Sequence, residues 1–302
     1  MEELEELNLS GSKIKELPLS INNLTGLSHL NLEHCVELKS LPSSIRMKSL
    51  KTFKLYGCTN LEMFPEISEV IEGLKELNLS GSKIKELPLS INNLTGLSHL
   101  NLKHCVELKS LPSSIRMKSL KTLNLYDCSN LEMFPEILEG IEELEELDLS
   151  GSKIKELPLS INNLTGLSYL SLKYCVELKS LPSSISQLKS LVSLSLSGST
   201  KFEVFPSIEE NMEGLRYLFL DGTSIKELSP WIEQLTGLRN QSDTTPRCGG
   251  FGGIGVVRRL ATAAYFEIHN SFDLCLCRNC EDIGMSIPVA NLLMPPVLFQ
   301  FG

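Results

Sequence analysis

Cysteine and histidine are the residues of this 302-residue sequence with the greatest potential for chemistry. His34 directly precedes a cysteine, and His104 does the same, so each pair sets a base beside a thiol. Catalysis would require such a base to lower the pKa of the thiol. Five of the nine cysteines, however, share one position of a repeat: Cys35, Cys58, Cys105, Cys128 and Cys175. This spacing favours a buried structural ladder of reduced thiols, and the sequence predicts no enzyme.

Two further patterns near the C-terminus suggest ligand chemistry but lack the surroundings that such sites require. Three glycines satisfy G-x-G-x-x-G, yet no strand precedes them and no βαβ unit follows, so a linker is the better interpretation. One histidine and three cysteines supply zinc-binding atoms, but without paired C-x-x-C motifs. No cofactor or metal is therefore predicted. The residues concerned are Gly250, Gly252, Gly255, His269, Cys275, Cys277 and Cys280.

The ladder cysteines belong to a repeat of 23 or 24 residues with the template L-x-x-L-x-L-x-x-(C/S)-x-x-(L/I)-x-x-(L/F)-P. A period in this range indicates a leucine-rich-repeat solenoid, in which each unit contributes one short strand. Stacking then buries leucines that no single unit could bury. The units begin at Leu4, Leu27, Leu50, Leu74, Leu97, Leu120, Leu144, Leu167, Leu191 and Leu215.

Alternation within each unit predicts which side chains face the core. Leu30 and Leu32 alternate with polar residues and are expected to point inward from a strand, while His29, Asn31 and Glu33 face solvent on a concave sheet. After the proline, "PSSIRMKSL" and "PEISEVIEGL" are expected to form one or two helical turns. The predicted fold class is α/β: a horseshoe solenoid with a parallel concave sheet and short helical or irregular convex segments.

The repeats are themselves repeated in larger blocks. Residues 4–73 and 74–143 are nearly identical, and a diverging copy begins at residue 144. Such identity at exposed positions indicates tandem duplication, which a solenoid tolerates because each unit contacts only its neighbours. We assign 1–240 to the leucine-rich-repeat domain. Residues 241–302 lose the periodicity and are predicted to be a tail, either a linker or translated noncoding sequence.

The charge balance limits the partners. A net charge of −9 and a pI near 5.2 disfavour nucleic acid and anionic membranes, since both attract clustered lysine and arginine. No transmembrane helix is expected, because prolines interrupt the apolar C-terminal stretch. The N-terminus has neither a basic n-region nor an apolar h-region. These features predict a cytoplasmic location, with the nucleus as a further compartment, and protein partners.

The Cys and Leu-Pro positions of "LEHCVELKSLPSSI", "LYGCTNLEMFPEI" and "LDGTSIKELSPWIEQLTGL" give the resemblance to a family. Roughly residues 1–240 resemble the leucine-rich-repeat domain of plant intracellular immune receptors, particularly those with a Toll/interleukin-receptor domain and a nucleotide-binding domain. The resemblance implies recognition of a pathogen effector or a guarded host protein, together with contact to the receptor's nucleotide-binding domain. A stand-alone signalling scaffold, similar to Ras-group leucine-rich-repeat proteins, is the alternative.

A protein partner is expected to bind the outward residues of the concave strands. Aromatic side chains there are the expected anchors, because binding energy concentrates in large amphipathic residues. Tyr169, Tyr174, Tyr217 and Phe219 are predicted to form the best cluster. The candidate contact residues are His29, Asn31, Tyr56, His99, Asn101, Lys103, Tyr126, Tyr169, Lys173, Tyr174, Tyr217, Phe219 and Asp221.

Overall fold

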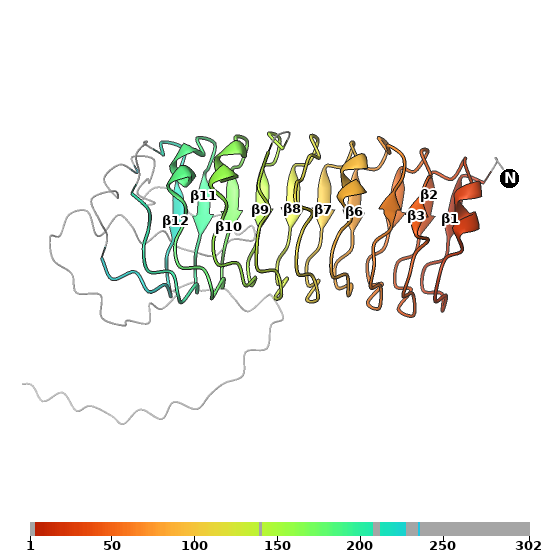
Figure 1. Ribbon diagram of the computed structural model, residues 1–302, viewed down its shortest axis with the longest axis horizontal. Helices are drawn as coiled ribbons and strands as arrows, with labels where there is room; N and C mark the ends of the chain where they lie inside the picture. Colours follow the sequence, from red (N-terminus) through yellow and green to blue (C-terminus); the bar gives the residue numbers. More distant parts are fainter. Residues whose placement is uncertain (1–3, 139–140, 208–211, 228–234, 236–302) are drawn as a thin grey trace, which may run out of the picture. The chain divides into compact units, whose positions relative to one another are not determined.

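The sheet of the solenoid is parallel, as predicted. The computed structural model describes residues 4–138, 141–207, 212–227 and residue 235. One ten-stranded sheet takes a strand from each successive unit, and neighbouring strands pair in register (Figure 1). Its strands are β1 (Glu6–Asn8), β2 (His29–Asn31), β4 (Thr52–Lys54), β6 (Glu76–Asn78), β7 (His99–Asn101), β8 (Thr122–Asn124), β9 (Glu146–Asp148), β10 (Tyr169–Ser171), β11 (Ser193–Ser195) and β12 (Tyr217–Phe219).

The core runs through the stack and is built from equivalent residues of successive units. Leu30 and Leu32 are fully buried, as the alternation predicts, and Leu27 and Leu38 fill the same interior. Burial of one leucine side chain contributes roughly 1.5–3 kcal/mol. Because each unit packs only on its neighbours, the stack gains this stabilisation one interface at a time.

The cysteine ladder lies where each chain segment leaves the sheet. The Cys35 thiol donates to the carbonyl oxygen of Leu9 in the preceding unit (3.1 Å), and Cys58 bonds Leu32 in the same way (3.0 Å). Burial raises the pKa of the Cys58 thiol to about 11. A neutral thiol is a poor nucleophile, so these contacts favour a structural role for the ladder.

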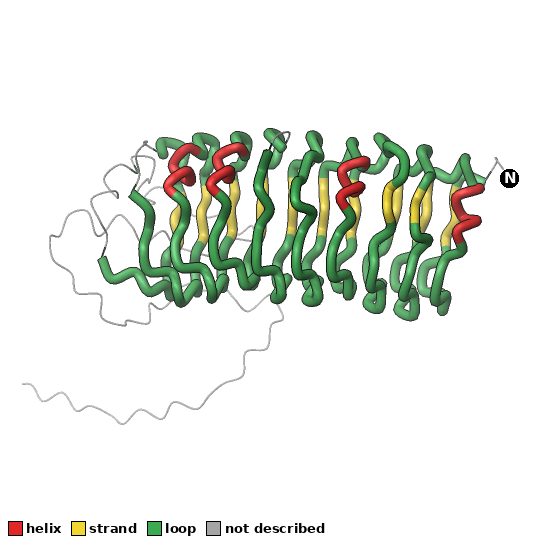
Figure 2. The backbone as a smooth tube through the Cα atoms, in the orientation of Figure 1, coloured by secondary structure: helices red, strands yellow, loops and turns green. Residues whose placement is uncertain are grey.

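Short 3₁₀ helices lie on the side of the stack opposite the sheet (Figure 2). Each follows a proline, which has an extended conformation, as at Pro18 with φ −72° and ψ 150°. The short convex helices are thus confirmed in part of the array. They are η1 (Leu19–Asn23), η2 (Leu89–Asn93), η3 (Leu159–Asn163) and η4 (Ser183–Gln187).

The helical turns predicted for "PSSIRMKSL" and "PEISEVIEGL" are wrong. These segments instead contain β3 (Ser44–Ile45) and β5 (Glu66–Ile67), which pair in a second, two-stranded parallel sheet. The same sequence at 112–120 forms neither a helix nor a strand, so the strand at Ser44–Ile45 depends on its pairing with Glu66–Ile67 of the next unit.

Part of the chain lies outside the described residues. The boundary at residue 240 and the predicted tail of 241–302, with its glycine, histidine and cysteine motifs, fall in this part. Within the described ranges, no helix is both long and apolar enough to span a bilayer. The same ranges contain no group of three or more metal-ligating side chains.

Candidate functional site

The outward side chains of the ten paired strands form two columns across the sheet. Register places each residue beside its equivalent in the next unit, as Glu6 beside His29 and Asn8 beside Asn31. His29, His99, Tyr169 and Tyr217 lie in the first column, and Asn31, Asn101 and Phe219 lie in the second. The sheet therefore presents a continuous surface to which every unit adds one pair of side chains.

The strands end earlier than predicted, at the second column, and asparagine side chains there close several of the turns that follow. Asn31 accepts a hydrogen bond on Oδ1 from the backbone N–H of Glu33 (2.9 Å). Asn101 holds Lys103 in the same way (3.0 Å). These asparagines thus have a structural role in addition to the predicted contact role.

Six candidate residues consequently lie in turns and not in strands, which corrects their predicted placement. These turns directly follow the strands and form one edge of the sheet. Several side chains at this edge are well exposed, with Tyr174 62% exposed. The six residues are Tyr56, Lys103, Tyr126, Lys173, Tyr174 and Asp221.

One turn position forces the backbone into the left-handed region. Six units have glycine there, but others have His34, His104, Asp127 and Tyr174, with φ between 56° and 58°. Left-handed backbone is unfavourable for residues with a Cβ atom. Strain of this kind, at exposed side chains, is often found where residues have a binding role.

Aromatic pairs join neighbouring units along this edge. The rings of His34 and Tyr56 meet edge-on at 5.2 Å, and those of His104 and Tyr126 at 5.4 Å. Lys103 also places Nζ 4.8 Å from the centre of the Tyr126 ring. The two pairs are 70 residues apart and fall at the same place in their three-unit blocks. The same aromatic contact therefore recurs three units further along the edge.

The predicted aromatic cluster at the end of the array is less compact than expected. Tyr217 and Phe219 lie on the same strand, β12, but Tyr169 lies on β10 with β11 between them. Two strand spacings separate them, or about 9–10 Å. Tyr174 stands in a turn and packs over Gly198 of the next unit. Of the four residues predicted to cluster, Tyr217 and Phe219 therefore remain together as a pair on β12.

We expect Gly198→Ala to lower the free energy of unfolding by about 2–3 kcal/mol. The new Cβ would overlap Cδ1 and Cε1 of Tyr174, and the backbone φ of +73° adds strain. Gly81→Ala, with φ +75° and open space around it, should lower the stability by only about 1 kcal/mol. Urea denaturation followed by circular dichroism measures both. Tyr174→Gly should bring the Gly198→Ala effect down to the Gly81 level, and failure of this rescue would contradict the proposed overlap.

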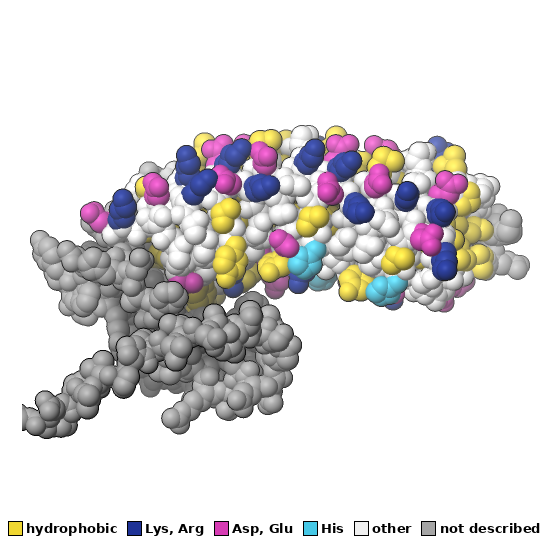
Figure 3. All heavy atoms as spheres, turned by 90° about the horizontal axis from the view of Figure 1, so that it is seen from below, with side chains coloured by type: hydrophobic (Ala, Val, Ile, Leu, Met, Phe, Trp, Pro, Cys, Tyr) yellow, Lys and Arg dark blue, Asp and Glu magenta, His cyan; other side chains and the backbone are white. Residues whose placement is uncertain are grey.

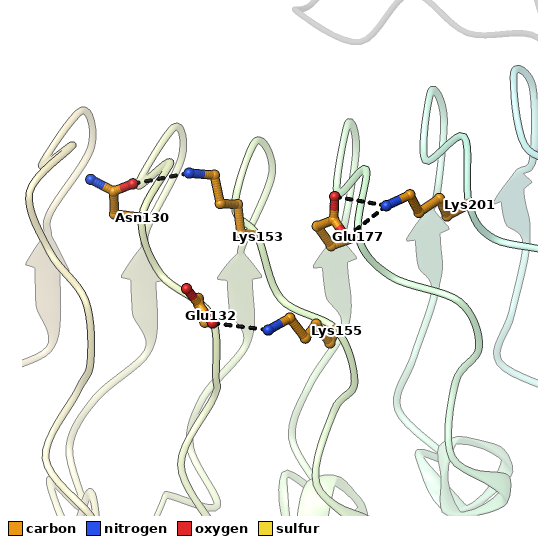
Figure 4. Close-up of polar contacts among 6 residues, drawn as sticks. All are labelled: Asn130, Glu132, Lys153, Lys155, Glu177 and Lys201. Atoms are coloured by element: carbon orange, nitrogen blue, oxygen red, sulfur yellow. Dashed lines mark hydrogen bonds and ion pairs between the residues drawn. The ribbon is translucent and has the colours of Figure 1, made fainter.

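Charged side chains form a second ladder in the loops that follow the strands (Figure 4). Lys155 is 3.0 Å from Glu132, and Lys201 is 2.8 Å from Glu177. The hydrogen bond from Lys155 lowers the pKa of Glu132. Figure 3 shows both charge signs mixed over the visible face, with no broad patch of one sign. Exposed pairs of this kind contribute little stability individually.

Sequence reasoning missed a recess in the sheet. Its volume is about 420 Å³, and it lies over β4 and β6. Lys51 and Lys75 border the recess from positions just before the two strands. Neither lysine was among the candidate contact residues. Comparing equivalent positions of adjacent units would have placed these lysines side by side. The recess is lined by Glu33, Lys51, Thr52, Phe53, Lys54, Tyr56, Lys75, Glu76 and Asn78.

Known proteins match both the sequence and the fold. Residues 46–119 and 116–203, together more than half of the chain, match the family described as "Disease resistance protein RPS4B-like, leucine-rich repeats". Two similar proteins of Arabidopsis thaliana are Disease resistance-like protein DSC1 (38% identity over 182 residues, 59% of this chain) and Disease resistance protein RPS4B (37% over 179 residues, 52% of this chain). The matched part is 15% of each of these relatives.

A solved structure agrees on the fold. The glycosylated Toll–Spatzle complex of Drosophila contains a chain that matches 79% of this chain at 20% identity, with a TM-score of 0.52. The match covers 38% of that chain. At this level of identity the likeness concerns the solenoid alone.

Proposed function

Because the chain belongs to the leucine-rich-repeat family of RPS4B-like disease resistance proteins, we propose that it is a protein-recognition module of plant immunity. Its partner would be a pathogen effector or a guarded host protein, met in the cytoplasm. The binding surface would be the outward columns of the parallel sheet together with the turn edge that follows them.

One observation supports this proposal most: in the first 42 residues of each duplicated copy, the differences coincide with the sheet surface. Residues 4–45, 74–115 and 144–185 align without gaps and differ at six positions. Each of these positions lies on an outward strand residue, in the residue before the strand, or in the turn after it. The differing sets are Glu5/Lys75/Glu145, Asn8/Asn78/Asp148, His29/His99/Tyr169, Asn31/Asn101/Ser171, Glu33/Lys103/Lys173 and His34/His104/Tyr174.

Exposure alone does not explain this distribution. Leu89 and its equivalent Leu159 on the opposite side are 57% and 69% exposed, and Val106 and Val176 are each 41% exposed, yet these residues are identical among the copies. In these 42-residue segments the sheet surface varies while the rest stays constant, which suits recognition of different partner groups. The third unit of each block also differs elsewhere, as at Ser68/Leu138.

We expect Tyr217→Ala combined with Phe219→Ala to weaken partner capture by roughly tenfold, since removal of aromatic anchors typically costs 1–2 kcal/mol or more. Proximity labelling in leaf cells that express the full chain would compare captured proteins for wild type and variant. Leu89→Ala combined with Leu159→Ala is the matched control on the opposite side. If the double aromatic variant keeps its circular dichroism spectrum and captures the same proteins as wild type, the proposed sheet surface is wrong.

A further inference from the structure

Two lysines without a counter-ion occupy equivalent positions just before β4 and β6. The pairing of these strands begins at Phe53 and Leu77, two residues after Lys51 and Lys75, and both lysines line the recess. Both side chains are exposed, and no ion pair joins either of them to another described residue. Two like charges at one recess repel each other unless an opposite charge comes between them. The pair therefore leaves two positive charges that a ligand can neutralise.

The duplicated copy provides a comparison within the same chain. Lys121 is the equivalent of Lys51, and both donate their backbone N–H to a serine carbonyl of the preceding unit at 2.8 Å. The residue beside Lys121, however, is Glu145, and the two side chains form an ion pair of 3.2 Å. Equivalent positions are thus neutralised in one place and left positive in the other.

The recess adds further contacts beside the lysine pair. Lys54 also lines it, and it is held only loosely by Glu33, at 3.8 Å and with 50% of the Lys54 side chain exposed. Thr52 presents a side chain between the positions of Lys51 and Lys54, and Tyr56, 47% exposed, borders the recess at the turn edge. Positive groups, a hydroxyl and an aromatic ring are therefore gathered at one place.

We propose that this recess binds an acidic segment of a protein partner, with a carboxylate seated between Lys51 and Lys75. The proposal rests on the recognition function proposed above. Glu76 and Glu33 in the lining limit the positive charge to a short stretch, which suits one or two carboxylates. A nucleic-acid backbone would need a longer basic surface than Lys51, Lys54 and Lys75 provide. Tyr56 would contact the side chain that flanks the carboxylate.

The direct test measures binding of a fluorescein-labelled peptide of eight glutamates to the full chain by fluorescence anisotropy at low salt. Lys75→Glu recreates the neutral pair found at Lys121 and Glu145, and it is expected to weaken binding at least tenfold. Lys39→Glu changes the net charge equally at an exposed site away from the sheet, and it should change the affinity less than twofold.

A gain of binding provides the sharper arm. Glu145→Lys places two lysines side by side at the second location, which should add a second binding site for the same peptide. The residues introduced at positions 75 and 145 already occupy the equivalent position in another copy, so the fold accommodates them. Equal losses for Lys75→Glu and Lys39→Glu, or no gain for Glu145→Lys, would overturn the proposal. Tighter binding of a single-stranded oligonucleotide of eight thymidines would overturn it as well.

These outcomes are separate from those that test recognition itself. If the glutamate peptide does not bind while leaf proteins are still captured through Tyr217 and Phe219, the acidic-segment proposal falls and the recognition function stands. If capture is insensitive to the sheet surface, the recognition function falls even where the peptide binds.

Discussion

Replacing Leu77 by alanine is expected to lower the free energy of unfolding by about 3 kcal/mol, whereas the same change at Leu7 should lower it by about 1 kcal/mol. The sequences around the two leucines are identical from residues 7–32 and 77–102, so their local propensities are equal. Leu77 is fully buried between two units. Leu7 is only partly buried, because the first unit has a neighbour on one side among the described residues.

The measurement is urea denaturation of the full chain, followed by far-ultraviolet circular dichroism. Leu147→Ala provides a replicate, since Leu147 is equivalent to Leu77 and is also fully buried. In a stack with nearest-neighbour interactions, loss of an inner leucine weakens two interfaces and loss of an end leucine weakens one. Equal effects at Leu7 and Leu77 would contradict this packing.

The repeat template was sufficient to predict the sheet and the core. Leu30 and Leu32 had to point inward because no other arrangement buries both, and the structure confirms them as buried. The parallel register also follows from the template, since equal units that stack in order must pair equivalent strands. Periodicity is a strong signal here because the same constraint acts ten times.

Local features were harder to predict from the sequence. Asn31 closes the turn after β2, but β4 and β11 end at the same place with Lys54 and Ser195, so the strand length follows from the turn that all ten units share. The extended backbone at Ser44–Ile45 depends on pairing with Glu66–Ile67 of the next unit, since the same sequence at 112–120 forms no strand. Local propensity for a helix start was real, but pairing between units prevailed.

The recess shows what a linear analysis misses. Lys51 and Lys75 are 24 residues apart and line one recess only when the units are stacked. Tyr56 was identified because aromatic side chains are prominent within one unit. Sites that form between units require the positions to be compared across units, column by column.

Raising the pH from about 9 to 11 is expected to destabilise the array steeply, because burial holds ladder thiols neutral in the folded state. The pKa of Cys58 and that of Cys175 are each raised to about 11, and burial also raises the pKa values of Cys105 and Cys128. Unfolded thiols ionise near pH 8.5, so above this pH the unfolded chain binds fewer protons. Stability is then full below about pH 8.5 and falls until the folded pKa is passed.

Each thiol that is ionised in the unfolded chain but neutral in the folded one lowers the free energy of unfolding by up to about 1.4 kcal/mol per pH unit in this window. The matched control replaces the four cysteines by serine, which occupies the same ladder position at Ser82 and Ser152. Urea midpoints of both proteins, measured under reducing conditions from pH 8 to 11, separate the thiols from other titrating groups. The serine variant should lose stability less steeply, because a serine hydroxyl does not ionise in this range. Parallel losses in the two proteins would mean that the ladder thiols ionise without unfolding, and that their burial is less complete than the stack of units requires.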